Sequence, residues 1–121
     1  MTNKYSAVPT VVDNVRFASK AEATRYRELL LLERAGFIRG LELQPAFPLY
    51  VAPHRGADVH HVCTYIADFR YREGPRGVLR VEDVKGVRTP VYRLKKKMVE
   101  AQYGIAITEI GPPSRHPRRR R

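Results

Sequence analysis

The hydrophobic pattern of this 121-residue chain changes its period at Gly36, and this change limits the chain to folds that combine helices with a sheet. Before Gly36, residues 19–35 carry good helix formers with apolar side chains at helical spacing. This segment opens on the Ser-x-x-Glu pattern of a capping box at Ser19, and Gly36 suits a helix end. After Gly36, apolar and polar residues alternate in short runs, which is typical of β-strands.

Several strands are predicted from this alternation and from the turn residues that interrupt it. Two short strands are expected at 41–43 and 47–51. Two longer ones are expected at 62–71 and 78–85, on either side of a Gly- and Pro-containing turn at 73–77. We expect the two longer strands to pair as an antiparallel hairpin.

A second helix is predicted to begin at Thr89, a good N-cap followed by proline, and to end at Gly104. Its buried face is expected to hold Val91, Leu94, Met98 and Ala101. A last strand follows at 105–110. Because the strand at 78–85 and this last strand flank a helical crossover, the sheet should contain parallel and antiparallel pairs. The predicted fold class is therefore α/β in the α+β sense, a mixed central β-sheet flanked by helices with core order α-β-β-β-α-β.

The chain is strongly basic, with 23 Lys and Arg against 12 Asp and Glu and a formal net charge of +11. The last eleven residues hold five arginines and no acid, which leaves 18 basic residues in the rest of the chain. Such a balance favours a polyanionic partner, with nucleic acid first. We expect an N-terminal arm at 1–16, one domain at 17–110 and a disordered basic tail at 111–121.

Composition also excludes several classes of protein. A single cysteine excludes an internal disulfide framework. No apolar run approaches the roughly 20 residues of a membrane span, and the N-terminus lacks the apolar stretch of a signal peptide. We therefore expect a soluble intracellular protein with no membrane partner.

Acidic residues end the apolar stripes of the two longer predicted strands. Alternation places Ile66 with Asp68 on one face, and Val81 with Asp83 and Lys85 on one face of the next strand. If both stripes point to the same core, these charges meet at its rim, where a lone buried charge would be costly. Two acids on adjacent strands can bind a hard cation such as Mg²⁺. The lysine can orient a water molecule or stabilise developing negative charge.

Asp68 followed by Asp83-Val84-Lys85 resembles the (D/E)…(D/E)-x-K core of the PD-(D/E)XK nuclease superfamily, although Ala67 stands where the name of that superfamily has Pro. A longer set of motifs resembles a family of small phage and prophage proteins of unknown function that is assigned to the same superfamily. This resemblance covers most of the chain and is carried by residues 17–22, 43–45, 65–69, 81–86 and 89–95.

The resemblance implies a Mg²⁺-dependent DNA endonuclease, with Mn²⁺ as a substitute metal and with resolvases and recombination nucleases as relatives. It implies as metal ligands Asp68, Asp83, Glu22 and the Val84 carbonyl. Lys85 would position the attacking water or stabilise negative charge on the phosphate. Gln44 would lie near the scissile phosphate, which completes an implied catalytic set of Glu22, Gln44, Asp68, Asp83 and Lys85.

Nucleic-acid binding is expected from cationic and aromatic residues that follow the site and from the tail. These residues are Arg88, Tyr92, Arg93, Lys95, Lys96, Lys97, Arg118, Arg119, Arg120 and Arg121. Contacts of this kind to the phosphate backbone are salt-sensitive and largely independent of base sequence. The expected partner is duplex or branched DNA in the cytoplasm of a bacterial host cell. A homodimer is one way to reach both strands.

Simpler interpretations stay open for each residue. Glu22 can be the capping-box acid, Asp68 a charge that protects a strand edge, and Asp83 with Lys85 a surface ion pair. Glu82 is a second acid beside Asp83, and we favour Asp83 because only Asp83 shares a strand face with Lys85. For the whole protein, the alternatives are a non-catalytic nucleic-acid-binding module of the same fold and a structural protein of a virion or its packaging machinery.

Overall fold

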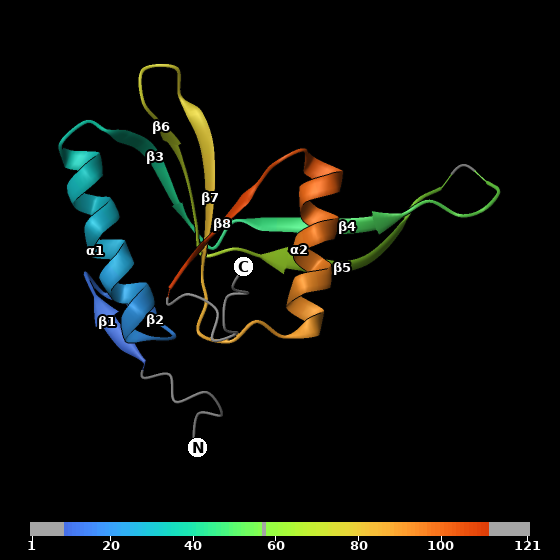
Figure 1. The fold of residues 1–121 in the computed structure, drawn as a ribbon, viewed down its shortest axis with the longest axis horizontal. Helices are drawn as coiled ribbons and strands as arrows, with labels where there is room; N and C mark the ends of the chain where they lie inside the picture. The colour runs from blue at the N-terminus through green and yellow to red at the C-terminus, as the bar shows by residue number, and fades with distance from the viewer. Residues whose placement is uncertain (1–8, 57, 112–121) are drawn as a thin grey trace, which may run out of the picture.

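The computed structural model describes residues 9–56 and 58–111 (Figure 1). Its elements, in chain order, are β1 (Thr10–Val12), β2 (Val15–Phe17), α1 (Lys20–Arg34), β3 (Ile38–Leu43), β4 (Ala46–Val51), β5 (His60–Ile66), β6 (Phe69–Glu73), β7 (Val78–Val84), α2 (Pro90–Tyr103) and β8 (Ile107–Ile110). Strands β1 and β2 form a hairpin that contacts α1, so the second half of the expected N-terminal arm is folded. Apart from Gly111, the expected basic tail at 111–121 lies outside the described residues.

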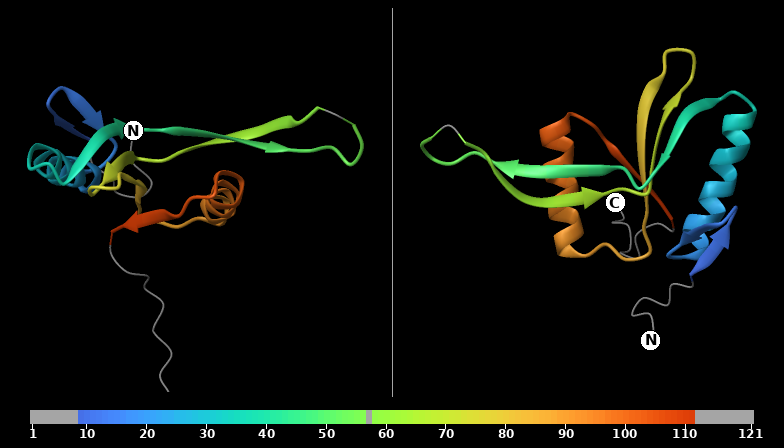
Figure 2. Two further views of the ribbon diagram at one scale, coloured as in Figure 1. Left: turned by 90° about the horizontal axis from the view of Figure 1, so that it is seen from above. Right: turned by 180° about the vertical axis from the view of Figure 1, so that it is seen from behind.

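The central sheet has the strand order β3-β6-β7-β8 and is mixed, as the sequence predicted. Strands β3, β6 and β7 are antiparallel neighbours, and β8 returns parallel to β7 after the crossover through α2. Strands β4 and β5 form a separate two-stranded sheet, a long hairpin that projects from the body (Figure 2). The predicted α+β class, with a mixed sheet flanked by helices, is therefore confirmed.

The single strand predicted at 62–71 is wrong, because the chain changes sheets at Ala67 and Asp68. Strand β6 pairs with β7 as predicted, whereas β5 pairs with β4. Ala67 is fully buried and Tyr65 is nearly so, whereas Ile66, which alternation placed toward the core, is 58% exposed. Side-chain alternation continues through this change of sheets, which is why the pattern alone concealed it.

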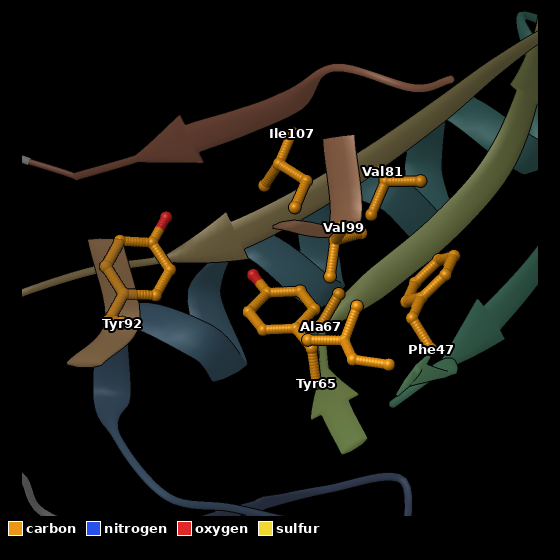
Figure 3. Close-up of a cluster of buried hydrophobic side chains, with 8 residues drawn as sticks. Phe47, Tyr65, Ala67, Val81, Tyr92, Val99 and Ile107 are labelled. Carbon is orange, nitrogen blue, oxygen red and sulfur yellow. The ribbon is translucent and has the colours of Figure 1, made fainter. Parts of the chain in front are cut away.

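Two clusters of buried side chains lie on the two faces of the central sheet. One lies under α1 and contains Phe17, Ala23, Tyr26, Leu29, Ile38, Phe69 and Tyr71. The other joins α2 and the β4–β5 hairpin to the sheet and contains Phe47, Leu49, Tyr65, Ala67, Val81, Tyr92, Val99 and Ile107 (Figure 3). Phe69 of β6 belongs to the first cluster and Val81 of β7 belongs to the second. Both faces of the sheet are therefore covered.

Helix α2 has the predicted ends but buries a different face. The Thr89 hydroxyl accepts the backbone N–H of Tyr92 at 3.1 Å, and Gly104 ends the helix in the left-handed conformation with φ of 65°. Val91 and Leu94, predicted to be buried, are more than half exposed, while Tyr92 and Val99 pack in the core. The amphipathic Tyr92, with a buried ring and a hydrogen-bonded hydroxyl, takes the place that the pattern gave to aliphatic residues. Within the described part of the chain, neither helix has the length and apolar character of a membrane span.

A buried ion pair joins α1 to the back of β7. Glu82 is 2% exposed, and its two carboxylate oxygens accept hydrogen bonds from Arg25 Nε at 2.7 Å and Nη2 at 2.6 Å. The Tyr71 hydroxyl donates to the same carboxylate. This paired arrangement satisfies a charge that would otherwise be buried alone.

Replacing Arg25 by alanine should therefore lower the free energy of unfolding by about 3 kcal/mol, because Glu82 loses its cationic partner. Urea unfolding followed by circular dichroism measures this loss. The control is Arg27→Ala on the exposed side of α1, which should stay within about 0.5 kcal/mol of wild type. Equal stability of the two variants would contradict a structural role for this pair.

Candidate active site

Asp68 stands at the corner between β5 and β6 and is fixed there by backbone hydrogen bonds. Its N–H donates to the Glu82 carbonyl at 3.0 Å, and its carbonyl accepts the Gln44 N–H at 2.9 Å. Its Oδ2 accepts the backbone N–H of Val84 at 2.6 Å, at the end of β7. Asp68 is thus a half-buried side chain tied to the neighbouring strand, and the simpler interpretation of an edge-protecting charge does not fit.

Asp83 lies on β7, on the face that packs toward α2, and is 2% exposed. Its Oδ2 accepts the Tyr65 hydroxyl, and its Oδ1 lies 3.1 Å from Lys85 Nζ. Burial, together with the hydrogen bond to Asp83, holds the pKa of Tyr65 well above its usual range, so this hydroxyl stays a donor. Because Asp83 is buried, its pair with Lys85 is not the surface ion pair that the sequence left open.

Lys85 follows Asp83 on the same face and lies between solvent and core, with its side chain 24% exposed. Its Nζ is 4.1 Å from the centroid of the Tyr92 ring, which is a cation–π contact. The Tyr92 hydroxyl donates to Glu109 Oε2 at 2.7 Å. Asp83 and Tyr92 therefore hold the amine from two sides and direct it to the rim of the core.

Glu22, in the first turn of α1, contributes a third acid to this rim. Burial, and then the nearby Asp83 carboxylate, raises the pKa of Glu22 above its ordinary value. Burial, Asp83 and Glu22 also raise the pKa of Asp68 to about 8, although the hydrogen bond from Val84 acts in the opposite sense. The backbone N–H of Glu22 is capped by Ser19 Oγ at 3.2 Å, so Glu22 belongs both to the helix cap and to the acidic rim.

Two adjoining pockets share Glu22 in their walls. The larger, of about 410 Å³, is also lined by Lys85, Gly86 and Tyr92. The smaller, of about 200 Å³, is also lined by Gln44 and Asp68. Four residues of the predicted catalytic set, Glu22, Gln44, Asp68 and Lys85, therefore line these two pockets. The fifth, Asp83, lines neither pocket and is buried beside them, in contact with Lys85.

The donor chemistry of this rim fits a hard divalent cation. Asp68, Asp83 and Glu22 offer carboxylate oxygens, the ligands that Mg²⁺ prefers. The like charges that raise the pKa values of Asp68 and Glu22 would be offset by a bound cation. Within residues 9–56 and 58–111, no group of three His, Cys, Asp or Glu residues is arranged to hold a metal ion, so these three side chains do not form a ready ligand set. Binding would require the three carboxylates to come closer together.

Sequence reasoning missed one residue of the site and gave another a different role. Tyr65 donates to Asp83, but the single predicted strand placed it on the face opposite Asp68 and gave no signal of this contact. Tyr92 was predicted to contact nucleic acid. It is 7% exposed, so its ring is covered and is better described as a support for Lys85.

The other predicted nucleic-acid contacts lie along and beside α2. A separate pocket is lined by the cationic residues Arg88, Arg93, Lys96 and Lys97. Lys95 is half-buried and does not line this pocket. The arginines at 118–121 lie outside the described residues.

The chain belongs to a protein family of unknown function, DUF1064, which matches residues 2–109. Comparison with the curated proteins and with solved structures gave no match. The family assignment therefore covers both helices and all eight strands except the end of β8, and it leaves the activity to be argued from the site.

Replacing Asp68 by asparagine should stabilise the metal-free protein, and increasingly so as the pH rises from 4 to 8. The pKa of this carboxyl is raised from 3.8 to about 8 by folding, so its ionisation opposes the folded state across that interval. Asparagine keeps an oxygen for the Val84 N–H but carries no charge. At pH 8 in EDTA we expect the unfolding free energy to increase by about 1 kcal/mol or more.

Denaturant unfolding of wild type and variant at several pH values measures this difference. Asp58→Asn, which removes an exposed acid beyond the tip of β4, is the control and should show no such trend. A difference between Asp68→Asn and wild type that does not grow with pH would contradict the proposed repulsion among the acids.

Proposed function

We propose that this chain is a metal-dependent endonuclease that hydrolyses phosphodiester bonds in DNA, with an active site of the PD-(D/E)XK type. One observation supports the proposal above all others. Two acids from the corner before β6 and from β7, Asp68 and Asp83, reach the same rim as Lys85, and this rim borders open pockets. Carboxylates beside a cationic side chain are suited to metal-assisted phosphodiester hydrolysis, in which the metal polarises the phosphate and activates water.

In this proposal Mg²⁺, or Mn²⁺ in its place, is held by Asp68, Asp83, Glu22 and the Val84 carbonyl. When bound, such a cation polarises the phosphate and lowers the pKa of a coordinated water. Lys85, steadied by Asp83 and Tyr92, orients the attacking water or donates to a phosphate oxygen. Gln44, beside Asp68 in the smaller pocket, contacts the substrate near the scissile phosphate.

The proposed setting is that of the phage and prophage proteins that the motifs resemble. The enzyme would act in the cytoplasm of a bacterial host on duplex or branched DNA, in recombination, repair or the resolution of junctions. A two-fold homodimer would present a second site to the opposite DNA strand.

A non-catalytic DNA-binding module of the same fold is the second candidate, and one observation favours it. Both oxygens of Asp83 already accept hydrogen bonds or ion-pair contacts from within the protein, from Tyr65 and Lys85. A network satisfied in this way also suits a purely structural role, in which the fold and its basic surface are kept without a reaction.

Asp83→Asn and Lys85→Ala should each lower the rate of Mg²⁺-dependent nicking of supercoiled plasmid by about 100-fold or more, because each removes a group that acts on the reacting phosphate. Retardation of the same DNA in EDTA should change by no more than about threefold, since most backbone contacts remain. Asp58→Asn again serves as the control and should cut as wild type does.

The result separates the two candidate functions. If Asp83→Asn and Lys85→Ala nick plasmid at the wild-type rate, the active-site assignment is wrong. If wild type retards plasmid and branched DNA but nicks neither with Mg²⁺ nor with Mn²⁺, the binding module is the correct function.

A further inference from the structure

A cationic groove runs between α2 and the edge strand β8, separate from the two pockets of the candidate active site. Its volume is about 440 Å³, and it is lined by Arg88, Arg93, Lys96, Lys97, Glu100 and Glu109. The four residues contributed by α2 follow one another at helical spacing, so they form a continuous stripe on one side of the helix. Cations outnumber acids in this lining by four to two.

Both acids of the groove are already engaged by neighbouring groups. Glu109 Oε1 accepts Arg88 Nε at 2.8 Å, and its Oε2 accepts the Tyr92 hydroxyl. Glu100 Oε2 lies 3.6 Å from Lys96 Nζ and accepts the backbone N–H of Ile107 at 2.9 Å. These contacts hold Arg88 and Lys96 against the walls of the groove and leave no acid for its other cations.

Arg93 and Lys97 are the cations that remain for an incoming ligand. Both are exposed, and neither makes an ion pair with any residue in the ranges 9–56 and 58–111. They are separated by one turn of α2, so their charges project into the groove side by side. A groove with free, adjacent cations and neutralised acids is suited to bind phosphate groups.

The groove is connected to the candidate active site by direct contacts. Asp83 and Glu109 are register partners on the neighbouring strands β7 and β8. Glu109 holds both Arg88 and the hydroxyl of Tyr92, and the Tyr92 ring lies beneath Lys85 Nζ. The groove and the acidic rim therefore lie at neighbouring strands of one sheet and are joined through Glu109 and Tyr92.

From this arrangement we infer that the α2–β8 groove anchors the DNA backbone beside the scissile phosphate, with Arg93 and Lys97 contacting successive phosphates. The inference rests on the proposed function for the identity of the ligand, since the groove itself defines only phosphate chemistry. In this view specific residues of α2 position the DNA, and the DNA is not held only by the general attraction of a basic surface.

The double variant Arg93→Gln/Lys97→Gln tests this assignment through binding of a short fluorescent DNA duplex in EDTA, where no metal-dependent cleavage occurs. Affinity should fall about tenfold or more, and the slope of log K against log salt should decrease in magnitude by about 2, roughly one for each lost phosphate contact. The matched control is Arg27→Gln/Arg34→Gln, which removes two exposed cations from the outer side of α1. It should leave the salt slope within about 0.5 of wild type.

Equal losses in the two double variants would overturn the inference, because binding would then depend on total charge. Displacement of the duplex by inorganic phosphate as effectively as by unlabelled duplex, at equal phosphate concentration, would also overturn it and indicate a site for free phosphate.

Nicking assays on the same variants separate this inference from the proposed function. If wild type cleaves DNA and Arg93→Gln/Lys97→Gln cleaves and binds DNA as well as wild type does, the inference about the groove is wrong and the proposed nuclease activity stands. If that variant loses duplex binding but wild type does not cleave DNA, the DNA-binding role of the groove is supported and the proposed nuclease activity is wrong.

Discussion

The hydrogen bond from the Val84 N–H to Asp68 Oδ2, 2.6 Å long, is the contact on which the geometry of the candidate site depends. It joins the corner where the chain leaves the β4–β5 hairpin to the end of β7. The corner cannot move aside, because Ala67 is fully buried and donates its N–H to the Pro45 carbonyl at 3.1 Å. Since Asp83 directly precedes Val84, the contact that anchors Asp68 also brings it beside the second acid. Two sheets that share no strand thereby contribute to one rim.

This rim carries an electrostatic conflict that the fold reduces but does not remove. Burial and like charge raise the pKa values of Asp68 and Glu22, which means that the ionised acids oppose folding near neutral pH. Donors from Val84, Tyr65 and Lys85 offset part of this cost. Elsewhere in the described residues, buried side-chain polar atoms have hydrogen-bond partners, and the apolar side chains gather in two buried clusters. A local conflict in an otherwise consistent fold is expected where function, and not stability, selects the residues.

The sequence was most informative where structure is decided locally. The start of α1 and both ends of α2 follow from Ser19, Thr89 and Gly104, whose capping bonds involve residues within about one turn. The β6–β7 hairpin follows from its turn residues, and the shared face of Asp83 and Lys85 follows from strand alternation. The sequence was uninformative where long-range packing decides. The pairing of β5 with β4, the rotation of α2 that buries Tyr92, and the contact of Tyr65 with Asp83 all depend on partners far along the chain, and no local pattern encodes them.

Glu82 and Asp83 show how neighbouring acids on one strand acquire different roles. Alternation sends Glu82 toward α1, where Arg25, 57 residues earlier in the chain, binds both of its oxygens. Asp83 points to the opposite face, where its cationic partner is the half-exposed Lys85 two residues later. The first acid is neutralised by a rigid bidentate contact and holds the helix to the sheet. The second is paired with a flexible amine beside open pockets, and its register partner Glu109 organises the cationic groove. Strand alternation thus separates a structural acid from a candidate reactive one within two residues of β7.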